Sequence, residues 1–463
     1  MSTVTFRNRS SELAALESVL DAPGAQLIVV WGRRRVGKTA LLREAVKERR
    51  HLYLVADTQR EDILLEMFAK ECASVLGPSG ISFRDWEAFF AYVADAAEKE
   101  ELVLVLDEVG FLHDVNPAFY SILQRHWDAR LSRTRLRLVL CGSAVSAMER
   151  HLMGYRSPLY GRRTGQLAVM PLSYVDARLF FPRAPEARRI ELFAVAGGVP
   201  AYLLQLNPSR NAMKNIEERV FTAISYLHRE PRFLLLQEVR EPATYFSVIT
   251  AMAAGATRFN DIAQRSGLTA TALGKYLGVL QELRLVRRML PATEAREARR
   301  NSRYEIADQF FAFWFRFVAP FAGALEADSM ESATAHLRAH WNEHVGRVFE
   351  EVCRDVVRHR PGAFGGQFER VGAWWSGEQE IDVAAVDRTR GRLFLAECKW
   401  TNKPVSVEVV HALLAKRELV EGRWKEVRLA VFSKSGFTEQ CEREAEDLLL
   451  IDLDGIRSLC ERE

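Results

Sequence analysis

Residues 32–39 (GRRRVGKT) have the types and spacing needed to hold a chain of phosphate groups. They follow the apolar run Gln26–Trp31 and precede a helical pattern over residues 40–49, which is the setting of a phosphate-binding loop. Backbone N–H groups would hold phosphate oxygens, Lys38 would reach the β- and γ-phosphates, and Thr39 would place its hydroxyl on Mg²⁺. The residues predicted to bind nucleotide here are Gly32, Arg33, Arg34, Arg35, Val36, Gly37, Lys38, Thr39 and Ala40.

Two carboxylates follow another strongly apolar run, residues 102–106. A carboxylate at the C-terminal end of a strand beside a phosphate loop can hold the Mg²⁺ shell, which is the role predicted for Asp107. Glu108 can orient or deprotonate the attacking water. Together with the phosphate loop, the pair predicts hydrolysis of a nucleoside triphosphate.

Three further residues are candidates for the same site, each with a simpler alternative. Ser143 ends an apolar run and either senses the γ-phosphate or caps the next helix. Arg162, in the LYGRR segment, either reaches the γ-phosphate, in its own chain or in a neighbour, or is an ordinary surface arginine. Pro200, in the GGVP turn, either contacts the base or simply lies where a helix has ended.

The last third of the chain carries a second group of chemically capable residues. Two apolar runs on either side of the polar turn 387–392 predict a hairpin. If strand pairing brings Asp382 beside Glu397, two carboxylates and the ammonium of Lys399 converge, since Glu397 and Lys399 share one strand face. Two carboxylates can bind Mg²⁺, Lys399 can position a water, and Glu350, on a helix over residues 341–359, can supply a further ligand.

The elements that must position these residues fall into three patterns. Residues 6–181 alternate buried-strand runs with amphipathic helices, which predicts a parallel sheet with crossover helices. Residues 182–336 are mostly helical. From residue 341 to the end, helices and strands alternate again.

The middle pattern contains a helix-turn-helix arrangement. Helices are predicted at residues 245–255, 259–266 and 269–283, with a glycine turn at Gly267 and two short strands afterwards, which together indicate a winged helix. A basic wing could neutralise DNA phosphates, but the alternative of a packing or assembly module stays open. Two glutamates and seven arginines lie in this wing; the arginines are Arg284, Arg287, Arg288, Arg296, Arg299, Arg300 and Arg303.

These motifs also resemble those of a known family. FRNRSSEL, GRRRVGKT, LVLDEVGFL, LCGSAVSAM, LYGRRTG and GGVPAYL are similar to the successive motifs of an archaeal-type ATPase family in the AAA+/STAND branch of P-loop NTPases, over residues 6–205. The resemblance implies that the nucleotide is ATP.

The C-terminal spacing has a resemblance of its own. Fourteen residues separate Asp382 from Glu397, and Lys399 follows two residues later, a spacing that resembles the PD-(D/E)xK nuclease fold. The segment from WW (residues 374–375) to LFLAECKWTNKPV (residues 393–405) is similar to part of the domain that accompanies this ATPase family. That resemblance covers residues 340–440. The proline of the nuclease pattern is absent here, because Glu380 and Ile381 precede the aspartate. A nuclease-like fold kept only for binding remains an alternative.

The expected fold class is therefore α/β. We expect a P-loop ATPase domain at residues 1–205, a helical and winged-helix module at 206–335, and a restriction-endonuclease-like domain at 336–463. The interpretation is an ATPase, using ATP and Mg²⁺, whose C-terminal domain cleaves DNA under control of the nucleotide state, in defence or in processing of mobile DNA. A non-cleaving DNA-binding regulator and a STAND-like signalling switch are the alternatives, and self-association stays open.

Composition sets limits on these expectations. The 463 residues are 48% hydrophobic and 27% charged, with a net charge of +3, which fits a globular protein and excludes a disordered chain. Six scattered cysteines favour a reducing compartment over a zinc site or a disulfide framework. The most apolar stretch, residues 310–321, contains Arg316 and is expected to be a buried helix, so a cytoplasmic protein is expected.

Overall fold

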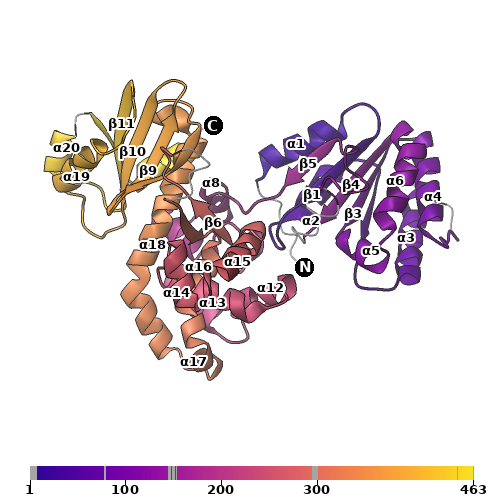
Figure 1. Ribbon diagram of the computed structural model, residues 1–463, viewed down its shortest axis with the longest axis horizontal. Coiled ribbons are helices and arrows are strands. Elements are labelled where there is room, and N and C mark those ends of the chain that lie inside the picture. Colours follow the sequence, from indigo (N-terminus) through magenta and orange to yellow (C-terminus); the bar gives the residue numbers. More distant parts are fainter. Residues whose placement is uncertain are drawn as a thin grey trace. The chain divides into compact units, whose positions relative to one another are not determined.

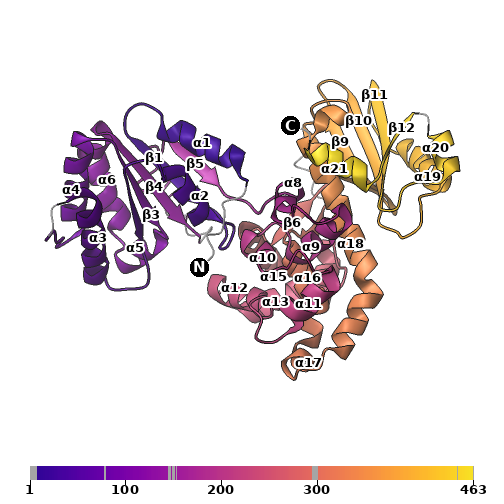
Figure 2. The same cartoon turned by 180° about the vertical axis from the view of Figure 1, so that it is seen from behind.

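The computed structural model describes residues 8–77, 80–143, 148, 152, 154–294, 301–445 and 447–461. The chain divides into two compact units, Met1–Pro171 and Leu172–Glu463 (Figure 1; Figure 2). The predicted division into three domains stays a prediction.

The first unit is built on the predicted parallel sheet. Its five strands lie in the order β2-β3-β4-β1-β5, and every neighbouring pair is parallel. Four of the strands coincide with the apolar runs, whereas the short edge strand β5 was not predicted from the sequence. The strands are β1 (Gln26–Trp31), β2 (His51–Val55), β3 (Leu102–Asp107), β4 (Leu136–Gly142) and β5 (Gly165–Ala168).

Helices cover both faces of this sheet because strand side chains alternate between the faces. Leucines of β1 to β4 pack under α3, α4 and α6, while valines and Cys141 pack under α1 and α2. The helices are α1 (Ser10–Leu20), α2 (Lys38–Val46), α3 (Glu61–Leu76), α4 (Trp86–Lys99), α5 (Gly110–Val115) and α6 (Phe119–Ala129). Helix α2 begins two residues before the predicted residue 40, since Gly37 caps it in a left-handed conformation.

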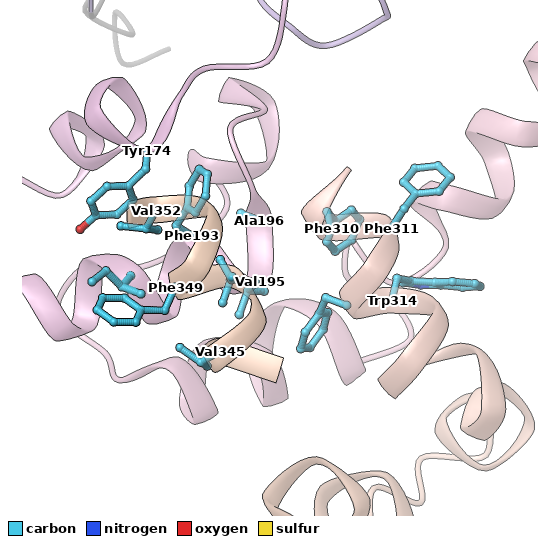
Figure 3. Packing of buried hydrophobic residues seen from close by; sticks show 14 of the residues in the cluster. Tyr174, Phe193, Val195, Ala196, Phe310, Phe311, Trp314, Val345, Phe349 and Val352 are labelled. Carbon is cyan, nitrogen blue, oxygen red and sulfur yellow. The ribbon is translucent and has the colours of Figure 1, made fainter. Parts of the chain in front are cut away.

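The second unit begins with a helical part whose core is aromatic (Figure 3). Helix α16 is buried on nearly all sides and packs against α9, α13 and α18. The long helix α18 begins ten residues before the predicted start, because Ala333 and Leu337 extend its buried face. The helices are α8 (Tyr174–Ala177), α9 (Glu186–Ala196), α10 (Pro200–Leu203), α11 (Ala212–Ile216), α12 (Glu230–Glu238), α16 (Gln309–Phe317), α17 (Ala322–Glu326) and α18 (Glu331–His359).

The expected helix-turn-helix region forms three helices and a hairpin. They are α13 (Pro242–Ala253), α14 (Phe259–Ser266) and α15 (Ala270–Glu282), followed by the antiparallel strands β6 (Val286–Met289) and β7 (Arg303–Ile306). Of the arginines predicted to form a basic wing, Arg296, Arg299 and Arg300 lie outside the described residues.

A mixed five-stranded sheet forms the C-terminal part of the second unit. Its order is β12-β11-β10-β9-β8, with antiparallel pairing of β8, β9 and β10 and parallel pairing of β10, β11 and β12. Helix α18 packs on one face and α19 on the other. The elements are β8 (Arg370–Ser376), β9 (Gln379–Asp387), β10 (Arg392–Lys399), α19 (Val407–Arg417), β11 (Glu426–Ser433), α20 (Glu439–Glu444), β12 (Leu448–Ile451) and α21 (Leu453–Glu461).

A register shift interrupts the pairing of β8 with β9. Gly372 pairs with Ala384 but Trp374 pairs with Ile381, so β9 carries one residue more than β8 at this point. Such a bulge redirects side chains and is frequent beside active sites. Asp382 lies in it. Among the described residues, no helix is both long and apolar enough to cross a membrane.

We predict that Gly198→Ala destabilises the second unit. A Cβ atom at position 198 would lie 1.8 Å from the carbonyl oxygen of Leu172, whose own N–H donates to the Gly198 carbonyl at 2.7 Å. Because this neighbour is backbone, the chain must shift, at a cost of ~2 kcal/mol or more. Thermal melting should show a fall of several degrees.

Gly274→Ala is the matched control. This glycine lies inside α15 and a Cβ there would meet nothing within 4 Å. Alanine should therefore stabilise the helix by about 0.5–1 kcal/mol. Equal melting temperatures for Gly198→Ala and the wild-type protein would contradict the argument.

Candidate functional site

The predicted phosphate loop connects β1 to α2 and requires glycine at its first position. A Cβ on Gly32 would lie 2.3 Å from the carbonyl oxygen of Val169, which follows β5. Arg35 and Gly37 both have positive φ angles, of 71° and 95°, so the loop turns tightly before the helix begins. This places a helix N-terminus directly behind the loop, which favours bound anions.

Lys38 is buried inside the loop. Its ammonium donates to the carbonyl oxygens of Gly32 at 2.8 Å and Arg33 at 3.1 Å. Only 5% of the residue is exposed, so the loop encloses the charge that would face the phosphates. An anion entering the loop would exchange these neutral acceptors for charged ones, which make stronger hydrogen bonds.

Thr39 and Asp107 come together at the end of β3. The Thr39 hydroxyl donates to Asp107 Oδ2 at 2.9 Å, and the Tyr53 hydroxyl donates to the same oxygen at 2.7 Å. Burial and the Asp107 charge raise the pKa of Tyr53, so its phenol stays a proton donor. Sequence reasoning did not identify Tyr53, although a hydroxyl-bearing residue in the apolar strand beside β3 was a visible signal.

Glu108 and Ser143 form a second contact at this edge of the sheet. Glu108 has a φ of 55°, a left-handed conformation that is strained for a residue with a Cβ. The Ser143 hydroxyl donates to Glu108 Oε1 at 2.6 Å, and Ser143 is buried. Ser143 thus orients the carboxylate that was predicted to act on water. The helix start that Ser143 was alternatively expected to cap lies outside the described residues.

Arg9 fastens the phosphate loop to the sheet and was not identified from the sequence. Its guanidinium donates to the carbonyl oxygens of Val36 at 2.6 Å and Met170 at 2.8 Å. It also pairs with Glu12 at 2.6 Å, and only 4% of Arg9 is exposed. The motif FRNRSSEL contained this residue, but nothing local indicated which atoms it would contact.

Arg162 and Pro200 have contacts of a different kind. Arg162 donates from Nε and Nη2 to the two carboxylate oxygens of Asp128, each at 2.7 Å, and its Nη1 donates to backbone carbonyl oxygens. Pro200 belongs to the second unit and begins α10, directly after Gly197 and Gly198 end α9. Their predicted contacts with the nucleotide stay predictions.

The C-terminal residues converge as the strand spacing predicted. Lys399 Nζ lies 2.7 Å from Glu397 Oε2 and 3.9 Å from Asp382 Oδ2. The Asp382 side chain also accepts the Cys398 backbone N–H at 2.8 Å, which anchors the carboxylate at the bulge. Burial lowers the pKa of Lys399, but the charges of Glu397 and Asp382 outweigh it and raise that pKa, so the ammonium stays charged.

A second lysine completes the group. Lys416, from α19, donates to Glu397 Oε1 at 2.7 Å, so each oxygen of this carboxylate faces an ammonium. The Glu397 side chain is only 4% exposed, so its negative charge must be balanced by positive charges nearby. Lys416 lies nineteen residues beyond Glu397 on a helix, and no sequence pattern connected the two.

Glu350 and Asp382 repel each other in this pocket. Burial and the Glu397 charge raise the pKa of Asp382 to about 6, while burial and the Asp382 charge raise that of Glu350 to about 8. Arg354 donates to the Asp382 carbonyl at 2.8 Å and offsets part of the negative charge. Like-charged carboxylates whose pKa values rise together are the arrangement that a divalent cation relieves.

The carboxylates and lysines lie in a pocket of about 620 Å³. Its walls come from α18, from the ends of β9 and β10, and from the β6–β7 hairpin. Among the described residues, no three Asp, Glu, His or Cys side chains are close enough to form a ready metal cage. A cation here would therefore have to draw Glu350, Asp382 and Glu397 together.

Comparison with known proteins assigns the family. The uncharacterized protein MJECL04 of Methanocaldococcus jannaschii is 31% identical over 420 residues, covering 90% of this chain and 92% of that protein. Residues 6–206 match a family described as an ATPase domain predominantly from Archaea. The chain belongs to this archaeal ATPase family. Residues 314–413 match a second family, described as archaeal and bacterial proteins of unknown function.

A solved structure supports the fold of this ATPase. The Walker-type ATPase PABY2304 of Pyrococcus abyssi is 21% identical, with a TM-score of 0.51, and covers 67% of this chain and 96% of that one. The ORC2 protein of Aeropyrum pernix, in ADPNP–ADP complexes, is 16% identical over 70% of this chain and 95% of that one, with a TM-score of 0.46. The family match over residues 6–206 confirms the expected resemblance to an archaeal ATPase family, while the resemblance to a nuclease domain stays a prediction.

We predict that Lys38→Ala in the ATPase domain lowers ATP turnover by at least about 100-fold, because the buried ammonium that would contact the β- and γ-phosphates is removed. Phosphate release measures the effect. Lys47→Ala is the matched control, since Lys47 follows α2, is half exposed and pairs only with Glu44 among the ion pairs of the described residues. Full turnover by Lys38→Ala would contradict the assignment of the loop.

We predict a pH-dependent stabilisation by Asp382→Asn. The pKa of Asp382 is raised to about 6 from 3.8, so the ionised carboxylate costs stability above pH 6, whereas below pH 3.8 the protonated side chain carries no such cost. Asparagine should therefore raise the free energy of unfolding by roughly 1–2 kcal/mol at pH 8 and by much less at pH 4.

Urea unfolding followed by tryptophan fluorescence measures this difference. The exposed Asp447, changed to Asn, is the matched control, and its effect should be small at both pH values. A destabilisation by Asp382→Asn at pH 8 that exceeds the one at pH 4 would contradict the direction of the pKa shift.

Proposed function

We propose that this ATPase carries a Mg²⁺-dependent DNA nuclease in its C-terminal part, and that the nucleotide state controls cleavage. The observation that carries the proposal is the convergence of Asp382, Glu397 and Lys399 in one pocket with Glu350. The family of the ATPase domain and the geometry of the phosphate loop support the first half of the proposal.

In the nucleotide site, each residue has a role set by its contacts. Lys38 and the loop N–H groups bind the phosphates, and Thr39 and Asp107 hold the Mg²⁺ that accompanies ATP. Glu108, oriented by Ser143, accepts a proton from the attacking water. Arg162 stabilises the γ-phosphate only if its pair with Asp128 opens, since both of its ends are engaged.

In the second site, the donor set fits a hard cation. Asp382, Glu397 and Glu350 offer carboxylate oxygens. Burial and the neighbouring negative charges raise the pKa of Asp382 and of Glu350. A bound Mg²⁺ would polarise a phosphodiester and lower the pKa of its water. Lys399, held by Glu397, positions that water and stabilises the negative charge that develops on the phosphate.

The remaining expectations belong to the same proposal. Three helices and a hairpin, α13 to β7, are interpreted as a winged helix, and DNA is the expected partner. All six cysteines are free and five are buried, which fits a reducing cytoplasm. Cleavage of foreign or mobile DNA is the biological role that the combination favours by analogy.

We predict that purified protein nicks DNA only when Mg²⁺ or Mn²⁺ is present. Lys399→Ala should lower the rate by at least about 100-fold, because the group that stabilises the developing charge is removed, while ATP turnover stays at the wild-type level. Gel analysis of labelled single-stranded, flapped and linear duplex DNA measures cleavage.

Lys403→Ala is the matched control, since this exposed lysine lies four residues further along the same segment. Cleavage that survives Lys399→Ala would show that the nuclease site is elsewhere. Binding without any cleavage of any substrate would favour the non-cleaving regulator, and an ATP-dependent change of size in light scattering would favour the signalling switch.

A further inference from the structure

The β6–β7 hairpin is docked on the exposed edge of the C-terminal sheet. After β6, the Ala292 N–H donates to the Ala373 carbonyl of β8 at 2.8 Å. Arg370 donates to the Glu294 carbonyl at 2.6 Å, and Arg388 donates to the carbonyl of Thr293. Ala292 is buried in the core cluster on the α19 side of the sheet. The segment that follows β6 is therefore held against the β8 edge, while β6 and β7 form a separate two-stranded sheet.

A second set of contacts holds β7 and the residues just before it. Arg303 pairs with Glu380 at 2.7 Å, and its guanidinium lies 4.5 Å from the ring centre of Trp375. The Trp375 indole N–H donates to the Asn301 carbonyl at 3.2 Å. Since Trp375 is 4% exposed, the hairpin covers it. The strand edge beside the bulge is closed by these contacts.

A third connection lies deeper. Arg287 of β6 pairs with Glu305 and with Glu351 of α18, and Glu351 also accepts from Arg354 at 3.1 Å. Burial raises the pKa of Glu351, but the charges of Arg287 and Arg354 outweigh it and lower that pKa. Separating β6 from α18 would remove a cationic partner from the buried Glu351 carboxylate, which is unfavourable.

The hairpin is consequently a wall of the carboxylate pocket. Arg287, Arg303 and Tyr304 line the same cavity of about 620 Å³ as Asp382 and Glu397. The side chains of Asp382 and Glu397 are only 17% and 4% exposed, so the reacting groups lie at the bottom of the cavity. A substrate phosphate must enter the cavity to reach them.

The size of the cavity selects among polynucleotides. A volume of about 620 Å³ is in the range that encloses a small-molecule ligand, which corresponds to roughly one or two nucleotides. The phosphates of a duplex lie on the surface of a wide, stiff cylinder, which such a cavity cannot admit. A single strand is narrow and flexible, and one or two of its nucleotides can enter such a cavity.

The cavity lining carries charges of both signs. Its arginines and lysines are matched by as many Asp and Glu side chains, and Arg316 and Arg347 share the carboxylate of Glu343. The guanidinium groups can bind phosphates of a strand that enters the cavity.

We propose that the C-terminal site cleaves single-stranded DNA, or the single-stranded part of a flap or end, and that the docked β6–β7 hairpin excludes intact duplex. The proposal rests on the proposed nuclease function. It assigns to the hairpin the role of a substrate filter, made by the edge contacts of Ala292, Arg370, Arg388 and Arg303.

The experiment compares three DNA probes of one sequence with the full-length protein and Mg²⁺ or Mn²⁺. They are a single-stranded oligonucleotide, the same strand as a flap on a duplex, and a covalently closed relaxed duplex circle. Cleavage of the first two should be at least about tenfold faster than nicking of the circle. A single-stranded RNA of the same sequence tests whether the sugar matters.

The double variant Arg370→Ala, Arg388→Ala tests the filter itself. Both arginines lie outside the cavity lining and hold the segment that follows β6 on the sheet edge. Loosening this segment should raise nicking of the closed duplex while single-strand cleavage stays within about twofold of wild type. Arg390→Ala is the control, because Arg390 lies in the same turn but pairs with Asp387.

The outcomes separate the two proposals. Equal cleavage of single strand and closed duplex by the wild-type protein overturns the filter while leaving the nuclease function intact. Unchanged duplex nicking in the double variant also overturns the role of the hairpin. Absence of cleavage of every probe, with either metal, overturns the nuclease function on which this inference rests.

Discussion

A carboxylate that a strand carries into the interior must have its charge compensated, and both sites follow from this constraint. Asp107 receives two hydroxyl hydrogen bonds, from Thr39 and Tyr53. Glu397 instead receives an ammonium on each oxygen. The hydroxyl groups around Asp107 add no positive charge, which suits a site that a phosphate-bound cation would enter. The arrangement around Glu397 keeps two lysines beside the position where a phosphodiester would react.

Helix α18 connects the helical part of the second unit to its sheet. It packs on α9 and α16 of the helical part and on β8, β9 and β10 of the sheet. Figure 3 shows Val345, Phe349 and Val352 of this helix in the apolar core. Glu350, which faces the carboxylate pocket, and Glu351, which binds Arg287 of the hairpin, are adjacent on this helix. Helix α18 thus positions Glu350, which is a proposed metal ligand. Through the adjacent Glu351 it also holds the hairpin that forms a wall of the same pocket.

Much of the fold and part of each site were predictable. Strands β1 to β4 of the first unit were recognised as apolar runs, and β1, β3 and β4 show no polar alternation because both of their faces are buried. The sequence made the convergence of Asp382 with Glu397 conditional on strand pairing, and the pairing of Ala396 with Val383 brings the two side chains together. The edge strand β5 was missed, since GQLA is too short and too polar to differ from a loop. The extra turns of α18 were missed because few residues of its first part are buried.

The sequence alone determined the phosphate loop, the two carboxylates at the end of β3 and the β9–β10 hairpin. The periodicity and turn residues that specify these features act within a few residues of one another. Only the tertiary structure decided which side chains meet across elements. Tyr53 donates to Asp107 because β2 pairs with β3. Arg162 donates to Asp128 of α6. Lys416 donates to Glu397 because α19 packs on the sheet. Those contacts depend on the packing of whole elements, and no spacing in the sequence encodes the distance between them.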